Sequence, residues 1–481
     1  MNFLKSFKLA TALLALLTVP VKNLMAAEAA TPFTLKAYLA QVGLQNNGYA
    51  AGILQIKAFE ARMAEGSLDF VPQLVGGYSY LDEKKVPLSA LTAGLETTAS
   101  NTNLGVQTKL RTGTIVNFNY ATGYTQIQGS SVLPNYAYYT ASPALMISQP
   151  LWRDFGASVS KATEEAIQTL YKMQAAQTKF SNGLILSNAE AAYWRLALYR
   201  QIVQQDRDAI DRTDKILAWN KKRFSMNVTD KSDLLISEAA LKGKQLQLQT
   251  DLELLRQTGS QFNSLRNLPG DKVTESLPTL ESAGDSGFAQ DLVRSGIRAD
   301  VQAMRFKAQN ERATARVSKG RVEPDISLFG MAQFNGNGLD NTSAMDKAWN
   351  SDHPTYAVGV KFSVPLDGSV IHRINEGYEA SASATELAIS RANFELDQDW
   401  NDLKKKYDDA IVRLKVAKEL ESLQFQKLDH ERTRLKGGRS TSYQVFQFED
   451  NYSDAVLAKL RIQSEIFSIR AQARLFNGEA L

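Results

Sequence analysis

Apolar residues recur at every seventh position along two long segments of the chain. In the first segment these positions are Ala189, Leu196, Val203, Ile210, Leu217 and Phe224. In the second segment, 211 residues later, they are Trp400, Tyr407, Leu414, Glu421, Leu428 and Leu435, and only Glu421 is polar. A seven-residue apolar repeat gives a helix one seam to bury and a left-handed supercoil. The pattern therefore predicts two long helices that pack along such seams.

The sequence that follows each segment is duplicated as well. Residues 223–238 read RFSMNVTDKSDLLISE and residues 434–449 read RLKGGRSTSYQVFQFE, so both stretches open with Arg, pass a polar or Gly-rich turn and end in Glu. Beyond the first turn the apolar seam continues through Leu234, Leu241, Leu248, Leu255 and Phe262. The chain is therefore predicted to hold two copies of one long helical hairpin, at about 156–268 and 368–476.

Each hairpin is preceded by segments in which apolar and polar residues alternate with a period near two, which is typical of strands. The first strand region covers about 71–150 and the second about 324–366. The stretch from Pro72 to Pro150 is 78 residues long, whereas the corresponding stretch from Pro324 to Pro365 is 41 residues long. The difference is an extra hairpin at 103–124, which either lies outside a barrel or adds strands to it.

Tyrosine is concentrated in the first strand region, at positions 120, 124, 136, 138 and 139. Tyrosine suits a membrane interface, but it also suits the half-buried strands of a soluble β-domain, and both interpretations stay open. The predicted strands of one chain are too few to close a barrel. Because open strand edges cannot face lipid, a membrane location requires several chains to complete one barrel.

The N-terminal 29 residues have the pattern of a secretory signal, with Lys5 and Lys8 before a short apolar run and small residues at 26–29. A membrane anchor is the alternative, but the run is too short to span a bilayer. Further helices are expected at 34–69, with Thr34 as N-cap, and at 291–319. The predicted organisation is thus a signal peptide (1–29), a first structural repeat (30–285) and a second repeat (286–481).

The composition offers little catalytic chemistry. The three histidines, His353, His372 and His430, are far apart, the chain has no cysteine, and no phosphate-binding or nucleophile motif occurs. Loss of the signal would lower the formal net charge from +4 to +2, because residues 1–29 contain three lysines and one acid, which leaves no basic footprint for nucleic acid. We therefore expect neither an enzyme nor a protein that needs a cofactor or a metal.

Several short stretches occur in an order and spacing that resemble the TolC-like outer-membrane efflux proteins. They are VPQL (71–74), SQPLWRDFG (148–156), AYW (192–194), the two turn stretches given above, RADVQA (298–303), EPDISL (323–328) and FSVPLDG (362–368). The resemblance implies a fold with an α-helical part and a membrane β-barrel. It further implies a homotrimer in which each chain gives four strands to a twelve-stranded outer-membrane barrel and long helices to a periplasmic barrel. The trimer would be a passive exit duct, and its partners would be a periplasmic adaptor, an inner-membrane pump and outer-membrane lipid.

In that family the turns near 225–232 and 436–442 form the periplasmic tip, where the duct narrows and the adaptor docks. The resemblance places Asp230, Asp233, Arg439, Gln444 and Gln447 there. Gln444 stands where the family commonly has Asp, which argues against an acidic ring from the second turn. Ordinary turn polarity also accounts for Arg439, Gln444 and Gln447. The alternative function is a structural or adhesive coiled-coil protein of the envelope.

Overall fold

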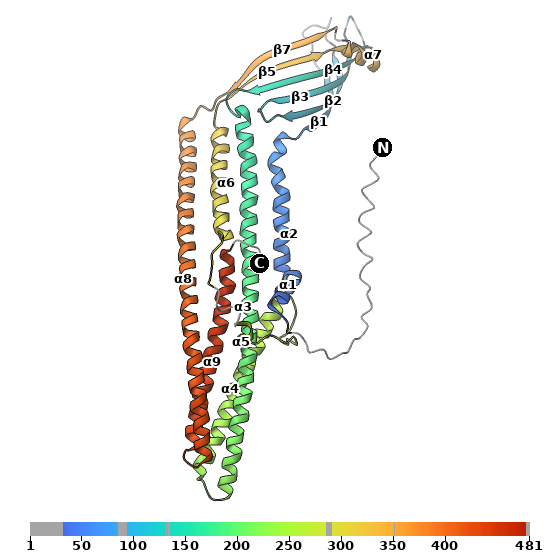
Figure 1. Cartoon of the computed structure of the whole chain (residues 1–481). Helices are drawn as coiled ribbons and strands as arrows, with labels where there is room; N and C mark the ends of the chain where they lie inside the picture. The colour runs from blue at the N-terminus through green and yellow to red at the C-terminus, as the bar shows by residue number, and fades with distance from the viewer. Residues whose placement is uncertain are drawn as a thin grey trace.

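A computed structural model describes residues 32–84, 94–130, 132, 135–284, 291–350 and 352–477. The predicted signal peptide (1–29) lies outside these residues. The protein is elongated, with one antiparallel sheet at one end and long helices that run away from it (Figure 1).

Two helices dominate the structure, and they are the ones that the seven-residue pattern predicts. Helix α3 (Ser158–Ser225) has 68 residues and α8 (Gly368–Lys436) has 69, so each is about 100 Å long at about 1.5 Å per residue. Each turns back at the far end into a shorter helix, α4 (Lys231–Ser264) or α9 (Ser442–Ala473). The two predicted hairpins are thus present. In the part of the chain that the structure describes, no helix is both long and apolar enough to cross a membrane.

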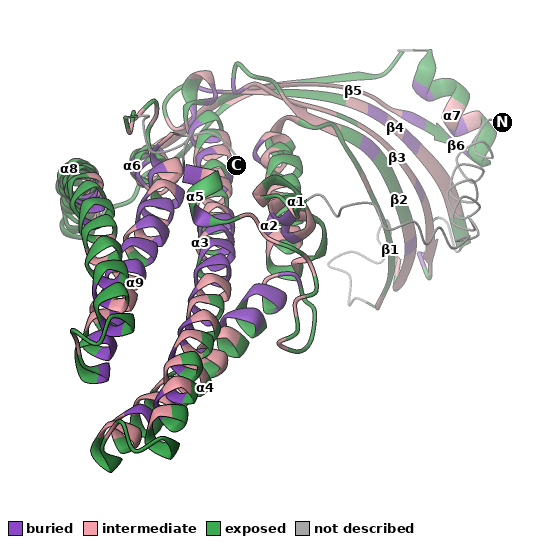
Figure 2. Cartoon of the chain, turned by 60° about the horizontal axis from the view of Figure 1, so that its bottom comes forward, coloured by how far each residue is buried: buried purple, intermediate pink, exposed green. Residues whose placement is uncertain are grey.

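The apolar seams of these helices are buried inside the single chain. Leu196 is 1% exposed and packs in a cluster with Phe262 and Phe467, while Leu414 is 5% exposed and packs with Tyr407 and Ile466. At the hairpin tip, by contrast, the seam residue Phe224 is 39% exposed. These two clusters hold α3 and α8 against α9, which lies between them (Figure 2).

The shorter helices flank the long ones. The single helix expected at 34–69 is divided into α1 (Leu35–Gln45), α2 (Asn47–Arg62) and a 3₁₀ segment (Met63–Phe70). Asn46 causes the break, because its side chain accepts a hydrogen bond from the Tyr49 N–H at 2.9 Å and so caps a new helix. Thr34 caps α1 as expected. Helix α6 (Ala299–Arg321) begins eight residues later than the 291–319 prediction, and α5 (Leu280–Gly284) and α7 (Asn341–Trp349) are short.

The sheet contains six long strands among the described residues. They are β1 (Gln73–Lys84), β2 (Glu96–Lys109), β3 (Ile115–Gln128), β4 (Asn135–Pro150), β5 (Asp325–Phe334) and β7 (Pro354–Ser363). They pair in the order β1-β2-β3-β4-β5-β7, and the short β6 (Gly336–Gly338) pairs with β4. The extra hairpin lies inside the sheet as β2 and β3. The sheet of one chain thus holds six long strands, two more than the four that the resemblance implies, because β2 pairs with all of β1 and β4 pairs with all of β3.

A sharp turn carries the chain from the sheet into α3. Asp154 and Gly156 both have left-handed backbone conformations, with φ of 63°. The Asp154 carboxylate accepts the backbone N–H groups of Val159 and Ser160 at 2.8 and 3.0 Å, and it forms an ion pair with Lys109 of β2. The start of α3 is thereby fixed directly to the turn end of the β2–β3 hairpin.

Candidate functional site

The two faces of the sheet differ sharply in polarity. Residues directly opposite each other on neighbouring strands share a face, and successive residues alternate between faces. One ladder row is formed by Leu74, Val106, Phe118, Leu145, Ala332 and Tyr356. Two residues further along the strands, the same face carries Val116, Ile147 and Val358. Although this face is apolar, Leu74, Tyr356 and Val358 are 74%, 71% and 81% exposed.

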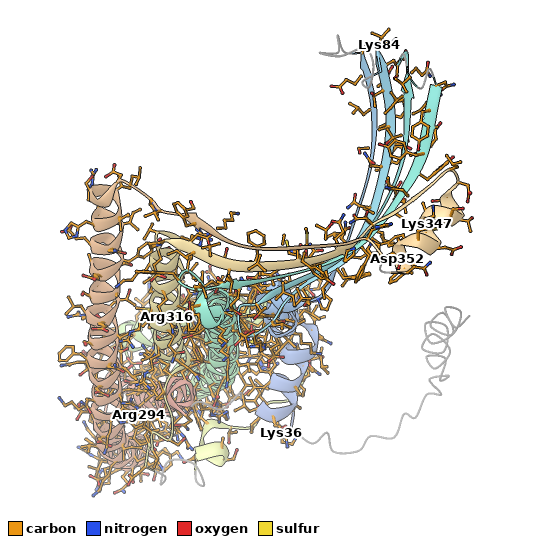
Figure 3. All side chains as sticks on the ribbon, turned by 90° about the horizontal axis from the view of Figure 1, so that it is seen from above. Lys36, Lys84, Arg294, Arg316, Lys347 and Asp352 are labelled. Atoms are coloured by element: carbon orange, nitrogen blue, oxygen red, sulfur yellow. The ribbon has the colours of Figure 1, made fainter. Side chains whose placement is uncertain are left out.

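The opposite face is polar. Its first ladder row is formed by Gln73, Gln107, Asn117, Met146, Met331 and Ala357, and the next positions on the same face include Asn119, Ser142, Gln333 and Thr355. The sheet curves as an arc, and α7 lies on its convex side (Figure 3). Because α7 packs on Tyr120, Tyr139 and Ala141, which belong to the first set of rows, the convex face is the apolar one. An apolar outside and a polar inside are what a barrel wall in lipid requires.

The tyrosine cluster is divided between the two faces. Tyr120, Tyr124 and Tyr139 lie on the convex face, whereas Tyr136 and Tyr138 lie on the concave face. The Tyr120 ring stacks on Trp349 of α7, with centroids 6.2 Å apart. The interface interpretation therefore fits the first three tyrosines only.

The residues proposed for the periplasmic mouth all lie at the end of the helices that is remote from the sheet (Figure 1). Asp230 precedes α4, and Asp233 in the first turn of α4 accepts a hydrogen bond from the Thr229 hydroxyl at 2.6 Å. Arg439 and Gln447 are exposed. Gln444 is also exposed, and its side-chain oxygen accepts a hydrogen bond from Ser440 at 3.0 Å. No hydrogen bond or ion pair within the described chain joins the two aspartates to the three residues of the second turn.

The two hairpins are nevertheless joined near the tip by buried polar groups. The Asn220 amide of α3 donates hydrogen bonds to Ser237 of α4 at 2.6 Å and to Ser442 of α9 at 2.7 Å. All three side chains are at most 4% exposed. Since a buried amide that loses its partners costs free energy, these bonds fix the position of the first turn against the second hairpin.

A buried ion triad reinforces this junction. The Glu449 carboxylate of α9 is 1% exposed and lies between Arg212 of α3, at 2.5 Å, and Arg432 of α8, at 2.6 Å. A second buried carboxylate, Glu431, pairs with Arg434 at 3.1 Å and accepts the Ser440 hydroxyl of the second turn. One anion thus holds three helices together.

Sequence reasoning did not identify these groups. Glu449 was visible as the last residue of the duplicated turn, but its copy Glu238 is exposed, so the duplication alone gave no reason to expect burial. Arg212 lies 237 residues from Glu449 in the chain, and neither its position in the helix nor its neighbours indicate that partner.

Two buried carboxyl groups face each other between α3 and α4. Asp206 is 8% exposed and Asp251 is 4% exposed. Burial, together with the adjacent Asp251, raises the pKa of Asp206 to about 7, although Lys244 opposes the shift. Lys244 itself pairs with Asp450 of α9 at 2.7 Å, and Gln247 donates to Asp251 at 2.7 Å. Around neutral pH, Asp206 therefore exchanges its proton while buried.

We expect Asp206→Asn to raise the thermal stability at pH 8 and to leave it nearly unchanged at pH 4. Because the folded pKa lies above the unfolded one, the folded state keeps a proton that the unfolded chain loses, so Asp206 costs stability progressively as pH rises from about 4 to about 7. Asn cannot ionise and removes that cost. Melting curves at both pH values measure the effect, with Asp214→Asn, an exposed neighbour on α3, as the control. An equal shift at both pH values would contradict this account.

Within the described residues, no group of three or more His, Cys, Asp or Glu side chains is placed to hold a metal ion. Glu449 and Glu431 pair with arginine, and Asp233 accepts the Thr229 hydroxyl.

Comparison with known proteins shows where this architecture has been seen. No protein-family profile and no curated sequence matches the chain. Solved structures do match. The outer membrane protein VceC from Vibrio cholerae has a TM-score of 0.66 at 14% identity, over 93% of this chain and 97% of that one. The Neisseria gonorrhoeae MtrE outer membrane channel, in its open state, has a TM-score of 0.63 at 13% identity, over 92% and 89%. The channel protein CusC has a TM-score of 0.62 at 13% identity, over 96% and 97%.

MtrE and CusC are described as channels and VceC as an outer membrane protein. At such low identity the likeness establishes the fold. The resemblance to TolC-like proteins that the sequence motifs indicate is thus confirmed at the level of the fold.

Proposed function

Starting from this outer-membrane channel fold, we propose that the chain forms an exit duct in the outer membrane. Three copies would surround one pore, with the sheets in the membrane and the helices extending into the periplasm. The duct would receive substrate from an inner-membrane pump through a periplasmic adaptor and would conduct it passively. The observation that carries this proposal is the pair of sheet faces, apolar and exposed outside, polar inside.

The sheet cannot stand in a membrane alone. Its pairing order ends at β1 on one side and β7 on the other, so each of these strands has one edge without a partner among the described residues. Unpaired N–H and C=O groups in hydrocarbon cost several kcal/mol each. Pairing of β1 with β7 of the next copy satisfies both edges, and because β1 ascends from the helices while β7 descends towards them, that pairing is antiparallel.

The helices also have an incomplete lateral surface. Helix α8 carries exposed apolar residues at a spacing close to whole helical turns, namely Leu387, Phe394, Val412, Val416 and Leu423. They are between 50% and 85% exposed in the single chain, and α8 forms one lateral edge of the protein (Figure 1). A periodic apolar stripe on a helix requires a covering partner. The neighbouring copy is the partner that also completes the sheet.

Planar-bilayer recordings test the function. A duct gives discrete, long-lived conductance steps when the purified protein is added. A structural or adhesive coiled-coil protein, which is the competing function, leaves the bilayer silent. The apolar convex face favours the duct, because a fibre in water would have no use for it.

The polar residues at the tip are expected to set the ion preference of the duct. Charge at a narrow ring is poorly screened and biases which ions enter. We expect Asp233→Asn to lower the preference for cations and Gln444→Asp to raise it, both read as shifts of the reversal potential under a salt gradient. Asp346→Asn on α7, which lies on the convex side of the sheet, is the control and is expected to cause no shift. Unchanged reversal potentials in both tip variants would show that these side chains do not line the constriction.

A further inference from the structure

We infer that the closed barrel has eighteen strands and that its outlet is correspondingly wider than that of the twelve-stranded barrel that the sequence resemblance implies. This inference rests on the proposed trimer. Its direct basis is that the chain has six long strands in one sheet and that β2 and β3 lie inside that sheet, between β1 and β4.

The first argument is the position of the additional hairpin. Pairing is unbroken for the full twelve residues of β1 against β2 and the full fourteen residues of β2 against β3. A hairpin that merely folded over a four-stranded wall would leave β1 paired with β4 directly. Instead, among the described strands β1 pairs with β2 alone. Removing β2 and β3 from the wall would therefore detach β1.

The second argument is that both faces continue through the hairpin. Far from the helices the convex face of β2 is polar, with Ser100, Thr98 and Glu96. On the half of the hairpin nearest the helices, the convex face carries Leu104, Val106 and Phe118, and the concave face carries Asn103, Asn117 and Asn119. This is the same division between lipid-compatible and water-compatible side chains as on β4, β5 and β7. A hairpin outside the barrel would have no reason to keep one apolar, exposed face in register with its neighbours.

The third argument is the tilt that the pairing register imposes. The row of paired residues that contains Gln73, at the start of β1, also contains Met146 of β4 and Ala357 of β7. Ala357 lies six residues above Ser363 at the base of β7. The ladder thus climbs about 20 Å while it crosses five strand spacings of about 4.8 Å, which is a tilt of about 40°. Closed barrels have tilts of about 35–45°, so the register of one chain already suits closure by identical copies.

The expected size follows from these values. Eighteen strands with a spacing of about 4.8 Å and a tilt of about 40° give a backbone diameter of about 36 Å, and twelve strands at the same spacing and tilt give about 24 Å. Barrels of 16–18 strands leave a water-filled channel. The proposed outlet therefore admits bulky solutes, and its side chains do not fill it.

Distances between spin labels on the three copies test the strand number directly. The chain has no cysteine, so a single Val358→Cys substitution on the exposed side of β7 gives one label per copy. Eighteen strands place the three labelled positions about 31 Å apart, and twelve strands place them about 21 Å apart. The matched variant lacks residues 96–128, so that β1 meets β4 directly. Gln73 and Met146 would still face the same side, and the distance should fall to about 21 Å.

A label at Lys418→Cys on α8 is the control, because the deletion leaves the helical part unchanged. A distance near 21 Å in the full-length protein, or an unchanged distance in the deletion variant, would overturn the eighteen-stranded barrel while leaving the trimeric duct standing. Absence of any dipolar coupling at either site would instead contradict the proposed trimer, and with it the eighteen-stranded barrel. If the deletion variant does not fold, the full-length distance alone decides.

Discussion

Leu196→Asp is expected to abolish assembly, leaving the protein unfolded or degraded in the periplasm. Leu196 is 1% exposed and lies in the cluster where α3 meets α4 and α9. A carboxylate at this position has no charged or polar partner, and burying it costs several kcal/mol, which is comparable with the whole stability margin of a domain. Leu414→Asp should have the same effect in the second hairpin, where Leu414 is 5% exposed. Trimer yield in membrane extracts measures both.

Leu196→Met is the matched control, because it keeps an apolar side chain of similar volume and should cost less than about 1.5 kcal/mol. Normal trimer yield from Leu196→Asp would show that the seam is not the structural core of the hairpin.

Glu449→Gln is expected to loosen the two hairpins from each other. The substitution keeps the shape of the side chain but removes the charge that Arg212 and Arg432 share. Two arginines would then face each other beside a neutral amide. Breaking a buried ion pair from one side costs about 3–5 kcal/mol. Hydrogen exchange should therefore accelerate in the tip segments of α3, α8 and α9, while the region near the sheet keeps its protection.

Asp454→Asn on the same helix is the control, because Asp454 is exposed. It should leave exchange unchanged. If Glu449→Gln also leaves exchange at the tip unchanged, the ion triad does not join the hairpins, and the Asn220 hydrogen bonds alone would hold the junction.

The long helices could be predicted because their pattern is local and repeated. A buried residue every seven positions marks the seam in the sequence itself, and Leu196, Leu414 and Leu428 are all buried where it places them. The turns carry Gly and polar residues at the predicted positions. Helix α6 was less predictable, since neither its composition nor a cap marks its start at Ala299.

The sequence predicted the strands, but it did not decide how many of them join one sheet. Alternation and the turn at Thr112-Gly113, where Gly113 has φ of 87°, identified the β2–β3 hairpin. Whether that hairpin joins the wall depends on pairing with β1 and β4, which are separated from it by loops. Such pairing is non-local, and the resemblance to a four-stranded family pointed the other way.

The candidate site shows the same limit. The five tip residues lie at the remote end of the hairpins, because they belong to the turns or to the first turns of α4 and α9, and their role there stays a prediction. The groups that join the hairpins, Asn220, Ser442 and Glu449, are polar residues on helices and look like ordinary solvated positions in the sequence. Only the packing of α3 against α9 buries them and gives them partners.

The mass of the protein extracted from outer membranes tests the central claim most directly. The described chain leaves both edges of its sheet and the apolar stripe of α8 uncovered. Light scattering of the detergent-solubilised protein, corrected for bound detergent, should give three times the mass of one chain. A stable, folded monomer, or recovery of the protein outside the outer-membrane fraction, would contradict the proposed trimeric duct.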